Sequence, residues 1–344
     1  MLRTKTIFTL SSNFVKSGFA FRFAHIQVTT KCNAKCLDRC TIWAQKPMEI
    51  PFQDLKFAID QLAKNNFSII YFTGGEPSLY PHLTEALKYV KSKHLLTSIT
   101  SNGLISEKQL REMKGYIDLL SVSVDHYDEK EWNKLKHVDD AADQAKKAIN
   151  AAKKYGINVV GLTFINPNWT TNDIEKIVKY TNNELGTSFS FCYPCISANG
   201  GTFIVGKNLS LENQNAHLKQ LLGKIEDLKQ QGYAITDLSE YLNDVQLAHN
   251  DLPMKHPCKA GKNVLFIDSN LDVFPCFKRA KMFNLKKDKF ELCTKDCPID
   301  NKNCLTGCFK EPSIMSGKHI LSIAKSEYGK NFHLYRKFVK GAFA

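Results

Sequence analysis

The sequence predicts an α/β fold built on a parallel sheet, and three observations predict it. The chain has 344 residues, 43% hydrophobic and 24% charged, which is typical of a globular protein with one large and one smaller domain. Between roughly residues 24 and 192, apolar runs of strand length alternate with amphipathic stretches of helical period. Turn signals such as Asn102–Gly103 and Tyr155–Gly156 mark boundaries between them. This alternation implies right-handed βαβ units, in which the loops after the strands carry the chemistry.

Six strands are expected in this part of the chain, one for each apolar run: His25–Thr30, Ser68–Thr73, Thr97–Thr100, Leu119–Val124, Asn158–Phe164 and Ser188–Cys192. Helices are expected between them, near residues 52–65, 81–93, 106–114, 139–155 and 171–183. Six such repeats form either an incomplete barrel or a doubly wound sheet, and periodicity alone does not choose between them.

The pattern changes beyond Gly200–Gly201. A helix rich in Leu, Lys and Gln is expected over residues 209–231, followed by the segment Asp237–Val245 and then a cysteine-rich stretch with little periodicity. The tail, Lys318–Ala344, is basic and carries aromatic residues, and we expect it to form a helix that packs back on the body.

Charge and hydropathy limit the classes of partner. The first 24 residues are basic and aromatic but lack an apolar stretch with a cleavage site, so we expect no secretory signal there but an amphipathic surface segment or an added β-hairpin. No apolar run reaches 18 residues, so we expect no membrane span and a cytoplasmic protein. The net charge of +13 favours anionic partners, yet the lysines are scattered as on a solvated surface, so nucleic acid is a possible partner that we do not favour.

The eleven cysteines fall into three groups, at residues 32–40, 192–195 and 258–308. Without a secretory signal, clustered cysteines indicate metal ligands rather than disulfides.

The first group comprises Cys32, Cys36 and Cys40, directly after the first expected strand. Three thiolates on one loop hold three irons of a cubane cluster and leave the fourth iron open for another ligand. Zinc is the alternative, because a zinc site needs only one further ligand.

This segment resembles the radical S-adenosylmethionine (radical SAM) superfamily, in which three and then two residues separate the cysteines and an aromatic residue often precedes the last one. Here both gaps have three residues and Arg39 replaces the aromatic residue. The resemblance implies that Cys32, Cys36 and Cys40 bind a catalytic [4Fe–4S] cluster. Trp43 lies near enough in sequence to take over the contact with the adenine.

The loop after the second strand matches a second motif of the superfamily, Gly74-Gly75-Glu76-Pro77. Adjacent glycines allow a close backbone approach, and a carboxylate beside them accepts hydrogen bonds from an ammonium group. The resemblance implies that this loop meets the amino group of S-adenosylmethionine. A strand-ending turn with a solvated Glu is the alternative.

Two further strand ends agree with the superfamily. Asn102 follows the third strand, and Ser123 and Asp125 follow the fourth, like the family's segments near the cosubstrate's carboxylate and ribose. Ser123 and Asp125 are of a type that hydrogen-bonds ribose hydroxyls. A common turn and a helix cap are the alternatives.

The C-terminal cysteines resemble the SPASM extension of radical SAM enzymes, which commonly binds two auxiliary four-iron clusters. Six cysteines are present, whereas two fully ligated clusters need eight, and Leu271 stands where a hairpin glycine is expected. We therefore expect one complete auxiliary cluster, or two with open or non-cysteine positions. The resemblance suggests the two sets Cys258, Cys276, Cys308 and Cys293, Cys297, Cys304. Zinc is the alternative for this region.

Cys192 and Cys195, after the sixth strand, supply a missing ligand or a substrate-facing thiol, or are buried as small apolar residues.

Taken together, the resemblance chooses a partial (β/α)6 TIM-like barrel with a small cysteine-rich C-terminal α+β domain. We divide the chain into an N-terminal extension, the barrel, a SPASM/twitch-like domain and a helical tail, at residues 1–23, 24–250, 251–312 and 313–344. The implied activity is reductive cleavage of S-adenosylmethionine to a 5′-deoxyadenosyl radical, which abstracts hydrogen from, or adds to, a peptide or small molecule. A flavodoxin or ferredoxin is the implied reductant. The alternative is a zinc-ribbon protein that binds or modifies RNA.

Overall fold

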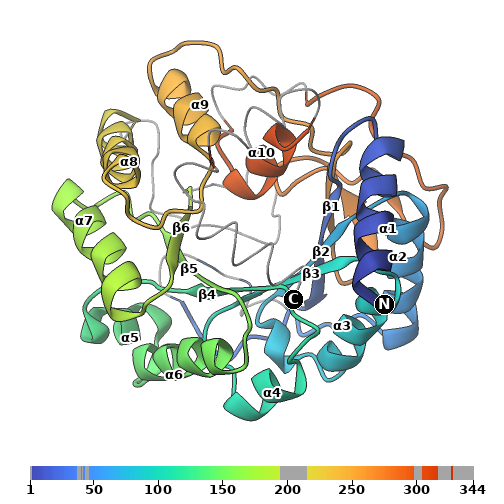
Figure 1. Ribbon diagram of the computed structural model, residues 1–344, viewed down its shortest axis with the longest axis horizontal. Coiled ribbons are helices and arrows are strands. Elements are labelled where there is room, and N and C mark those ends of the chain that lie inside the picture. The colour runs from blue at the N-terminus through green and yellow to red at the C-terminus, as the bar shows by residue number, and fades with distance from the viewer. Residues whose placement is uncertain are drawn as a thin grey trace.

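The computed structural model describes residues 2–36, 40, 42, 46–193, 215–297, 304–316 and 327. Its described strands form one open sheet in the order β6-β5-β4-β3-β2-β1-β7-β8-β9. The first six strands curve around a centre, and the helices that connect them lie on the outside (Figure 1). The sheet does not close, so the predicted partial barrel is confirmed and the doubly wound alternative is wrong.

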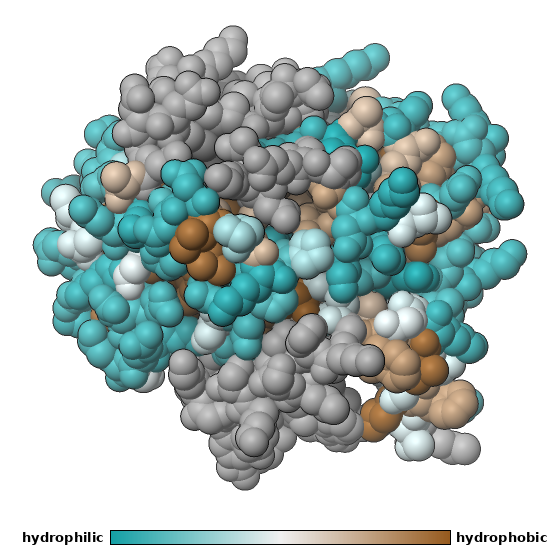
Figure 2. All heavy atoms as spheres, turned by 90° about the horizontal axis from the view of Figure 1, so that it is seen from above, coloured by the Kyte–Doolittle hydropathy of each residue, from teal (hydrophilic) through white to brown (hydrophobic). Residues whose placement is uncertain are grey.

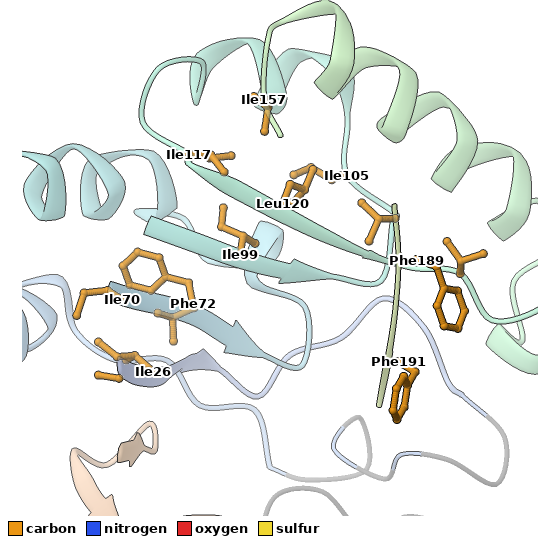
Figure 3. Close-up of a cluster of buried hydrophobic side chains, with 14 of the residues drawn as sticks. Ile26, Ile70, Phe72, Ile99, Ile105, Ile117, Leu120, Ile157, Phe189 and Phe191 are labelled. Carbon is orange, nitrogen blue, oxygen red and sulfur yellow. The ribbon is translucent and has the colours of Figure 1, made fainter. Parts of the chain in front are cut away.

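The six predicted strands are all present, and each is parallel to its neighbours. Their bounds are β1 Phe23–Thr29, β2 Ile69–Gly74, β3 Leu96–Ser101, β4 Leu119–Ser123, β5 Val159–Phe164 and β6 Ser188–Cys192. Alternate residues of each strand point to opposite faces of the sheet. The side chains that face the helices form the core: those of Ile70, Phe72, Ile99 and Leu120 lie together in Figure 3 and are fully buried.

The helices have the bounds α1 Leu2–Lys16, α2 Phe52–Lys64, α3 Leu83–Ser92, α4 Glu107–Glu112, α5 Glu129–Lys136, α6 Ala141–Lys154, α7 Thr171–Lys179, α8 Asn215–Gln230, α9 Ser239–His249 and α10 Gly307–Ile314. A 3-10 turn, η2 (Pro77–Leu79), follows β2, and a π-helical turn, η3 (Tyr180–Glu184), extends α7. Capping boxes start two of these helices, with Ser106 and Gln109 at α4 and Thr170 and Asp173 at α7.

Helix α5 was not expected from the sequence. Its eight residues include only two apolar ones, Trp132 and Leu135, which is too few to show a helical period. The signal that was present is its cap: the Asp128 side chain accepts hydrogen bonds from the backbone N–H groups of Lys130 and Glu131.

The cysteine-rich region continues the barrel sheet. β7 (Val264–Ile267) pairs in parallel with β1, and β8 (Asp272–Phe274) and β9 (Phe283–Asn284) follow as antiparallel strands. β7 and β8 therefore form a hairpin. Leu271 takes the place of the hairpin glycine with a φ of 63°, the left-handed conformation that glycine adopts most easily. Its side chain is buried in the core, which offsets the backbone strain.

The N-terminal segment forms α1, which fits the predicted amphipathic surface segment and not a β-hairpin. On its inner side, the Asn13 side-chain N–H donates to the carbonyl oxygen of Phe67 at 2.9 Å. On its outer side, Phe8 is 76% exposed.

The molecular face in Figure 2 is mostly hydrophilic, with hydrophobic residues in small groups. No helix in the described part of the chain is long and apolar enough to cross a membrane. The turn at Gly200–Gly201 and the predicted tail helix, apart from Glu327, lie outside the described residues.

Candidate active site

Three neighbouring strands bring the predicted motifs together. The cysteine loop follows β1, the Gly-Gly-Glu-Pro loop follows β2, and Asn102 follows β3. Because these strands are adjacent and parallel, their C-terminal ends meet at one edge of the sheet. The site is therefore built from segments that are far apart in the sequence.

Glu76 connects these loops. One carboxylate oxygen, Oε1, accepts hydrogen bonds from the Ser101 hydroxyl and the Ser78 backbone N–H, both at 3.0 Å. The other, Oε2, accepts from the Asn102 backbone N–H at 2.7 Å. The residue is fully buried. These bonds connect the ends of β2 and β3, and the contact of the carboxylate with an ammonium group stays a prediction.

The two glycines allow a close approach, but to the cysteine loop. A Cβ atom on Gly75 would lie 2.1 Å from the Lys31 carbonyl oxygen, and one on Gly74 would lie 2.3 Å from that of Thr29. Hydrogen bonds tie the same segments, from the Gly75 N–H to the Thr29 carbonyl and from the Glu76 N–H to the Lys31 carbonyl, each at 2.8 Å. Glycine is required here because the backbones touch.

Asn102 contacts the cysteine loop directly. Its side-chain amide donates to the Asn33 side-chain oxygen at 2.8 Å and lies 3.7 Å from the Cys32 sulfur. Burial raises the pKa of the Cys32 thiol, and it raises the pKa of Cys40 to about 11, where nearby Cys36 and Cys32 act in the same direction. The three predicted cysteines therefore lie in one electrostatic neighbourhood, in which a bound metal cluster would favour the thiolates.

A buried lysine beside this loop was missed from the sequence. Lys136 ends α5 and pairs with Asp125 at 2.9 Å, with side chains that are 3% and 10% exposed. Its charge lowers the pKa of both Cys32 and Cys40, which partly offsets their burial. Its backbone carbonyl also accepts a hydrogen bond from the Lys35 N–H. The signal that could have found it is the Asp128 cap that starts α5.

The structure describes Ser123, Pro77 and Asp125 among the remaining residues that were predicted to contact the cosubstrate. The Ser123 hydroxyl donates to the Ser101 carbonyl at 3.3 Å, and Pro77 begins η2 and is buried. The ribose contacts of Ser123 and Asp125 stay predictions. Trp43, Arg39 and Cys195 lie outside the described residues.

The two predicted ligand sets of C-terminal cysteines stay predictions, and the structure describes the surroundings of each thiol. The thiols of Cys258 and Cys297 are hydrogen-bonded, which with burial raises the pKa of Cys258, and Cys304 acts on it in the same direction. Burial raises the pKa of Cys276 to about 11, and Cys304 and Cys297 add to that shift. Four thiols from both predicted sets therefore share one neighbourhood.

The other two C-terminal cysteines have different surroundings. The Cys293 sulfur lies 4.0 Å from that of Met282 and would be 2.6 Å from a Cβ on Gly261. Cys308, at the start of α10, is exposed and lines the central cavity, as does Cys192 at the end of β6. Among the described residues, no group of three His, Cys, Asp or Glu side chains is arranged to hold a metal ion.

The inner face of the barrel lines a partly open cavity of about 860 Å³. Its wall includes His25 of β1, Tyr71 of β2, Ser121 of β4, Ser190 of β6 and Glu311 of α10. These residues were not predicted as site residues. The period-two pattern of β1, in which His25 and Gln27 alternate with apolar residues, was the available signal that polar side chains face inward.

His25 joins the barrel to the cysteine-rich region. Its Nε2 lies 3.1 Å from the Cys308 carbonyl oxygen, and its ring stacks on Tyr71 at 4.9 Å between ring centroids. Burial lowers the pKa of His25 to about 4, so the ring is neutral at neutral pH and its Nε2–H donates to that carbonyl. Burial also raises the pKa of Tyr71, and Glu311 and Cys308 add to the shift.

This geometry agrees with the comparison to known families. Residues 26–181 match the family model of the Radical SAM superfamily, so this part of the chain is similar to radical SAM domains. The predicted resemblance to that superfamily is confirmed.

Curated relatives include the Fe-coproporphyrin III synthase of Methanosarcina barkeri (strain Fusaro / DSM 804), 27% identical over 210 residues, which are 60% of this chain and 52% of that protein. Another is the S-adenosylmethionine-dependent nucleotide dehydratase of the Thermoplasmatales archaeon (strain ISO4-H5), 36% identical over 114 residues, which are 32% of this chain and 40% of that protein. Both are named as enzymes, and the chain spans about half of their length or less.

Solved structures share the fold over most of the chain. Streptococcus suis SuiB bound to S-adenosylmethionine superposes with a TM-score of 0.62 at 20% identity, covering 80% of this chain and 67% of that one. Native anSMEcpe with bound AdoMet gives a TM-score of 0.60 at 18% identity, covering 91% of this chain and 98% of that one. The likeness therefore extends beyond the matched radical SAM domain into the C-terminal region.

Proposed function

We propose that the protein is a radical SAM enzyme that cleaves S-adenosylmethionine reductively and acts on a peptide or small-molecule substrate in the barrel cavity. The observation that carries the proposal is the junction of three loops at the C-terminal ends of β1, β2 and β3. There, Glu76 and Asn102 hold the loop that bears the cysteines in place. The matched family domain spans these same strands.

Cys32, Cys36 and Cys40 would hold the catalytic [4Fe–4S] cluster, and their shared neighbourhood supports this assignment. The chemistry that such a cluster would supply, with S-adenosylmethionine bound beside it, is one-electron reductive cleavage to a 5′-deoxyadenosyl radical. The chain's own part is to fix the loop through Asn102 and to place the positive charge of Lys136 beside the thiols. If the N-terminal loop bound zinc instead, the domain could not cleave S-adenosylmethionine reductively.

We further propose one auxiliary cluster held by Cys258, Cys276, Cys297 and Cys304. This set is supported by the hydrogen bond between the thiols of Cys258 and Cys297, and by Cys297 and Cys304, which both raise the pKa of Cys258 and of Cys276. Four cysteines are a complete ligand set for a four-iron cluster. Cys308 then faces the cavity instead of serving as a ligand.

A peptide is the substrate class that the neighbours favour, because another structure of SuiB contains the precursor peptide SuiA, with a TM-score of 0.60 to this chain. The cavity, at about 860 Å³, has room for a side chain with part of its backbone, or for a small molecule. A flavodoxin or ferredoxin as reductant and a cytoplasmic location stay predictions. The alternative of an RNA-binding zinc protein gains no support from these matches.

The test is anaerobic reconstitution followed by analysis of iron, sulfide and zinc, with 5′-deoxyadenosine measured after reduction by dithionite. We expect wild-type protein to form 5′-deoxyadenosine and Cys36→Ser to form none. The control Lys147→Ala changes an exposed lysine on α6 and should behave as wild type. Product formation by Cys36→Ser, or a wild-type protein that binds only zinc, would refute the proposal.

A further inference from the structure

A buried group of ionisable side chains lies beside the cavity, where β6, the start of α9 and α10 come together (Figure 1). Among the residues that the structure describes, it contains one lysine, Lys229 of α8, and three carboxylates, those of Asp237, Glu311 and Glu327. Lys229 pairs with Glu327 at 2.9 Å, with side chains that are 2% and 0% exposed. The ammonium group also donates to the backbone carbonyl of Asp237.

Burial raises the pKa of Asp237 and of Glu311, and the charge of Lys229 offsets that rise only in part. Burial raises the pKa of Glu327, but Lys229 and the Ser239 N–H lower it by more. The Glu327 carboxylate is therefore the one that pairs with the charge of Lys229. Asp237 accepts hydrogen bonds at Oδ1 from the Ser190 hydroxyl at 3.2 Å and the Phe191 N–H at 3.5 Å. Its other oxygen, Oδ2, has no partner among the described residues. The described part of this buried group therefore contains more carboxylates than ammonium groups.

Glu311 is the carboxylate of this group that lines the cavity. One oxygen, Oε1, accepts a hydrogen bond from the Leu238 backbone N–H at 2.6 Å. The side chain lies deep in the protein yet keeps partial exposure, which is the combination expected of a group that faces an internal cavity. Ser190, which donates to Asp237, lines the same cavity.

We propose that Glu311 binds a cationic group of the substrate, an ammonium or guanidinium, inside the barrel cavity. The inference rests on the proposed function, because it treats this cavity as the substrate site of a radical SAM enzyme. A buried carboxylate next to a second one is disfavoured unless it takes up a proton or meets a cation. A cationic substrate group supplies that cation, and a charge-assisted hydrogen bond of this kind contributes about 1.5–3 kcal/mol, or roughly tenfold to a hundredfold in affinity.

Proton binding competes with the substrate cation. Burial raises the pKa of Glu311 well above its usual value, with Asp237 adding to the shift, and burial raises the pKa of Asp237 to about 7. A proton therefore resides on the pair at neutral pH, and preference for a cation should grow as pH rises. Other ionisable groups that face this site from the surrounding elements are His25, Tyr71, Lys229, Tyr241, Cys308 and Glu327.

The experiment uses two probes that differ only in the ammonium group, N-acetyl-lysine N-methylamide and N-acetyl-norleucine N-methylamide. Their binding to the reconstituted protein is measured by saturation-transfer NMR between pH 6 and 8.5, without reductant. We expect the lysine probe to bind at least tenfold more tightly at pH 8.5, and the advantage to shrink toward pH 6. Glu311→Gln, which keeps the bond from the Leu238 N–H, should abolish the preference.

Two further variants keep the test decisive. Asp237→Asn retains an oxygen for Ser190 and Phe191 and removes the neighbouring charge, so the preference should appear at lower pH. Glu107→Gln changes an exposed acid and should leave the preference unchanged. Equal binding of both probes by the wild type, or a preference that survives Glu311→Gln, would overturn the proposal. Formation of 5′-deoxyadenosine is measured separately, so failure of the radical SAM function remains distinguishable.

Discussion

Replacing Glu76 by glutamine tests whether this carboxylate holds the active-site loops together. The amide keeps one oxygen acceptor and turns the other into an N–H₂ group. Three donors converge on the carboxylate, so at least one of them, the Asn102 N–H or the Ser78 N–H with the Ser101 hydroxyl, then faces another donor. The site is fully buried, and losing a hydrogen bond to a charged group costs about 1.5–3 kcal/mol. We expect Glu76→Gln to lower the free energy of unfolding by roughly 2–4 kcal/mol.

The assay is urea unfolding at pH 7.5, followed by circular dichroism, on the protein without cosubstrate. Glu107→Gln is the matched control, because Glu107 pairs with Lys154 at the surface and the same change there should alter stability by less than about 0.5 kcal/mol. If Glu76→Gln unfolds like the wild type but no longer forms 5′-deoxyadenosine, then the carboxylate acts on the cosubstrate and not on the loops. That result would refute the structural role of Glu76.

Three further changes test the site and the cavity. Gly75→Ala should reduce the iron retained on reconstitution severalfold, because its Cβ would lie 2.1 Å from the Lys31 carbonyl; retention of full iron would contradict this packing. Lys136→Met removes the cation that pairs with the buried Asp125 carboxylate and should destabilise the protein by about 3–5 kcal/mol in urea unfolding, whereas an unchanged midpoint would show that the pair is solvated. Because the folded pKa of His25, about 4, lies below its ordinary value of 6.5, stability should fall as pH drops from 6.5 to 4. His25→Gln should remove about 2 kcal/mol of the stability difference between pH 7.5 and 5, and an identical pH dependence in both proteins would disprove the assignment.

Much of the barrel could be predicted because short strand-length segments with regularly placed apolar residues alternate with amphipathic helices. Ser188–Cys192 was predicted to the residue, and the other strands to within one or two positions. Helix α5 left no such signal, because its stability comes from a capped N-terminus and a buried Trp132 and not from a repeated apolar face.

The site could be predicted only where one loop carries the chemistry. Each predicted motif directly follows a strand, so it could be recognised from the local sequence. The contacts between motifs could not be predicted from the local sequence, and neither could the packing role of the glycines. Gly75 resembled a residue that makes room for a ligand, whereas the structure shows it packed on Lys31. Lys136 and Glu311 reach the site from helices whose positions depend on the tertiary fold.

The pairing of β7 with β1 ties the cysteine-rich region to the barrel. β1 carries the cysteine loop at its end, lies between β2 and β7, and places His25 against the Cys308 carbonyl. β1 therefore contacts both cysteine-bearing regions. α10 bears Cys308 and Glu311 one turn apart and lines the cavity. Because the His25 ring on β1 bonds to the Cys308 carbonyl, a change that displaces this end of α10 should also disturb the cavity wall near Glu311.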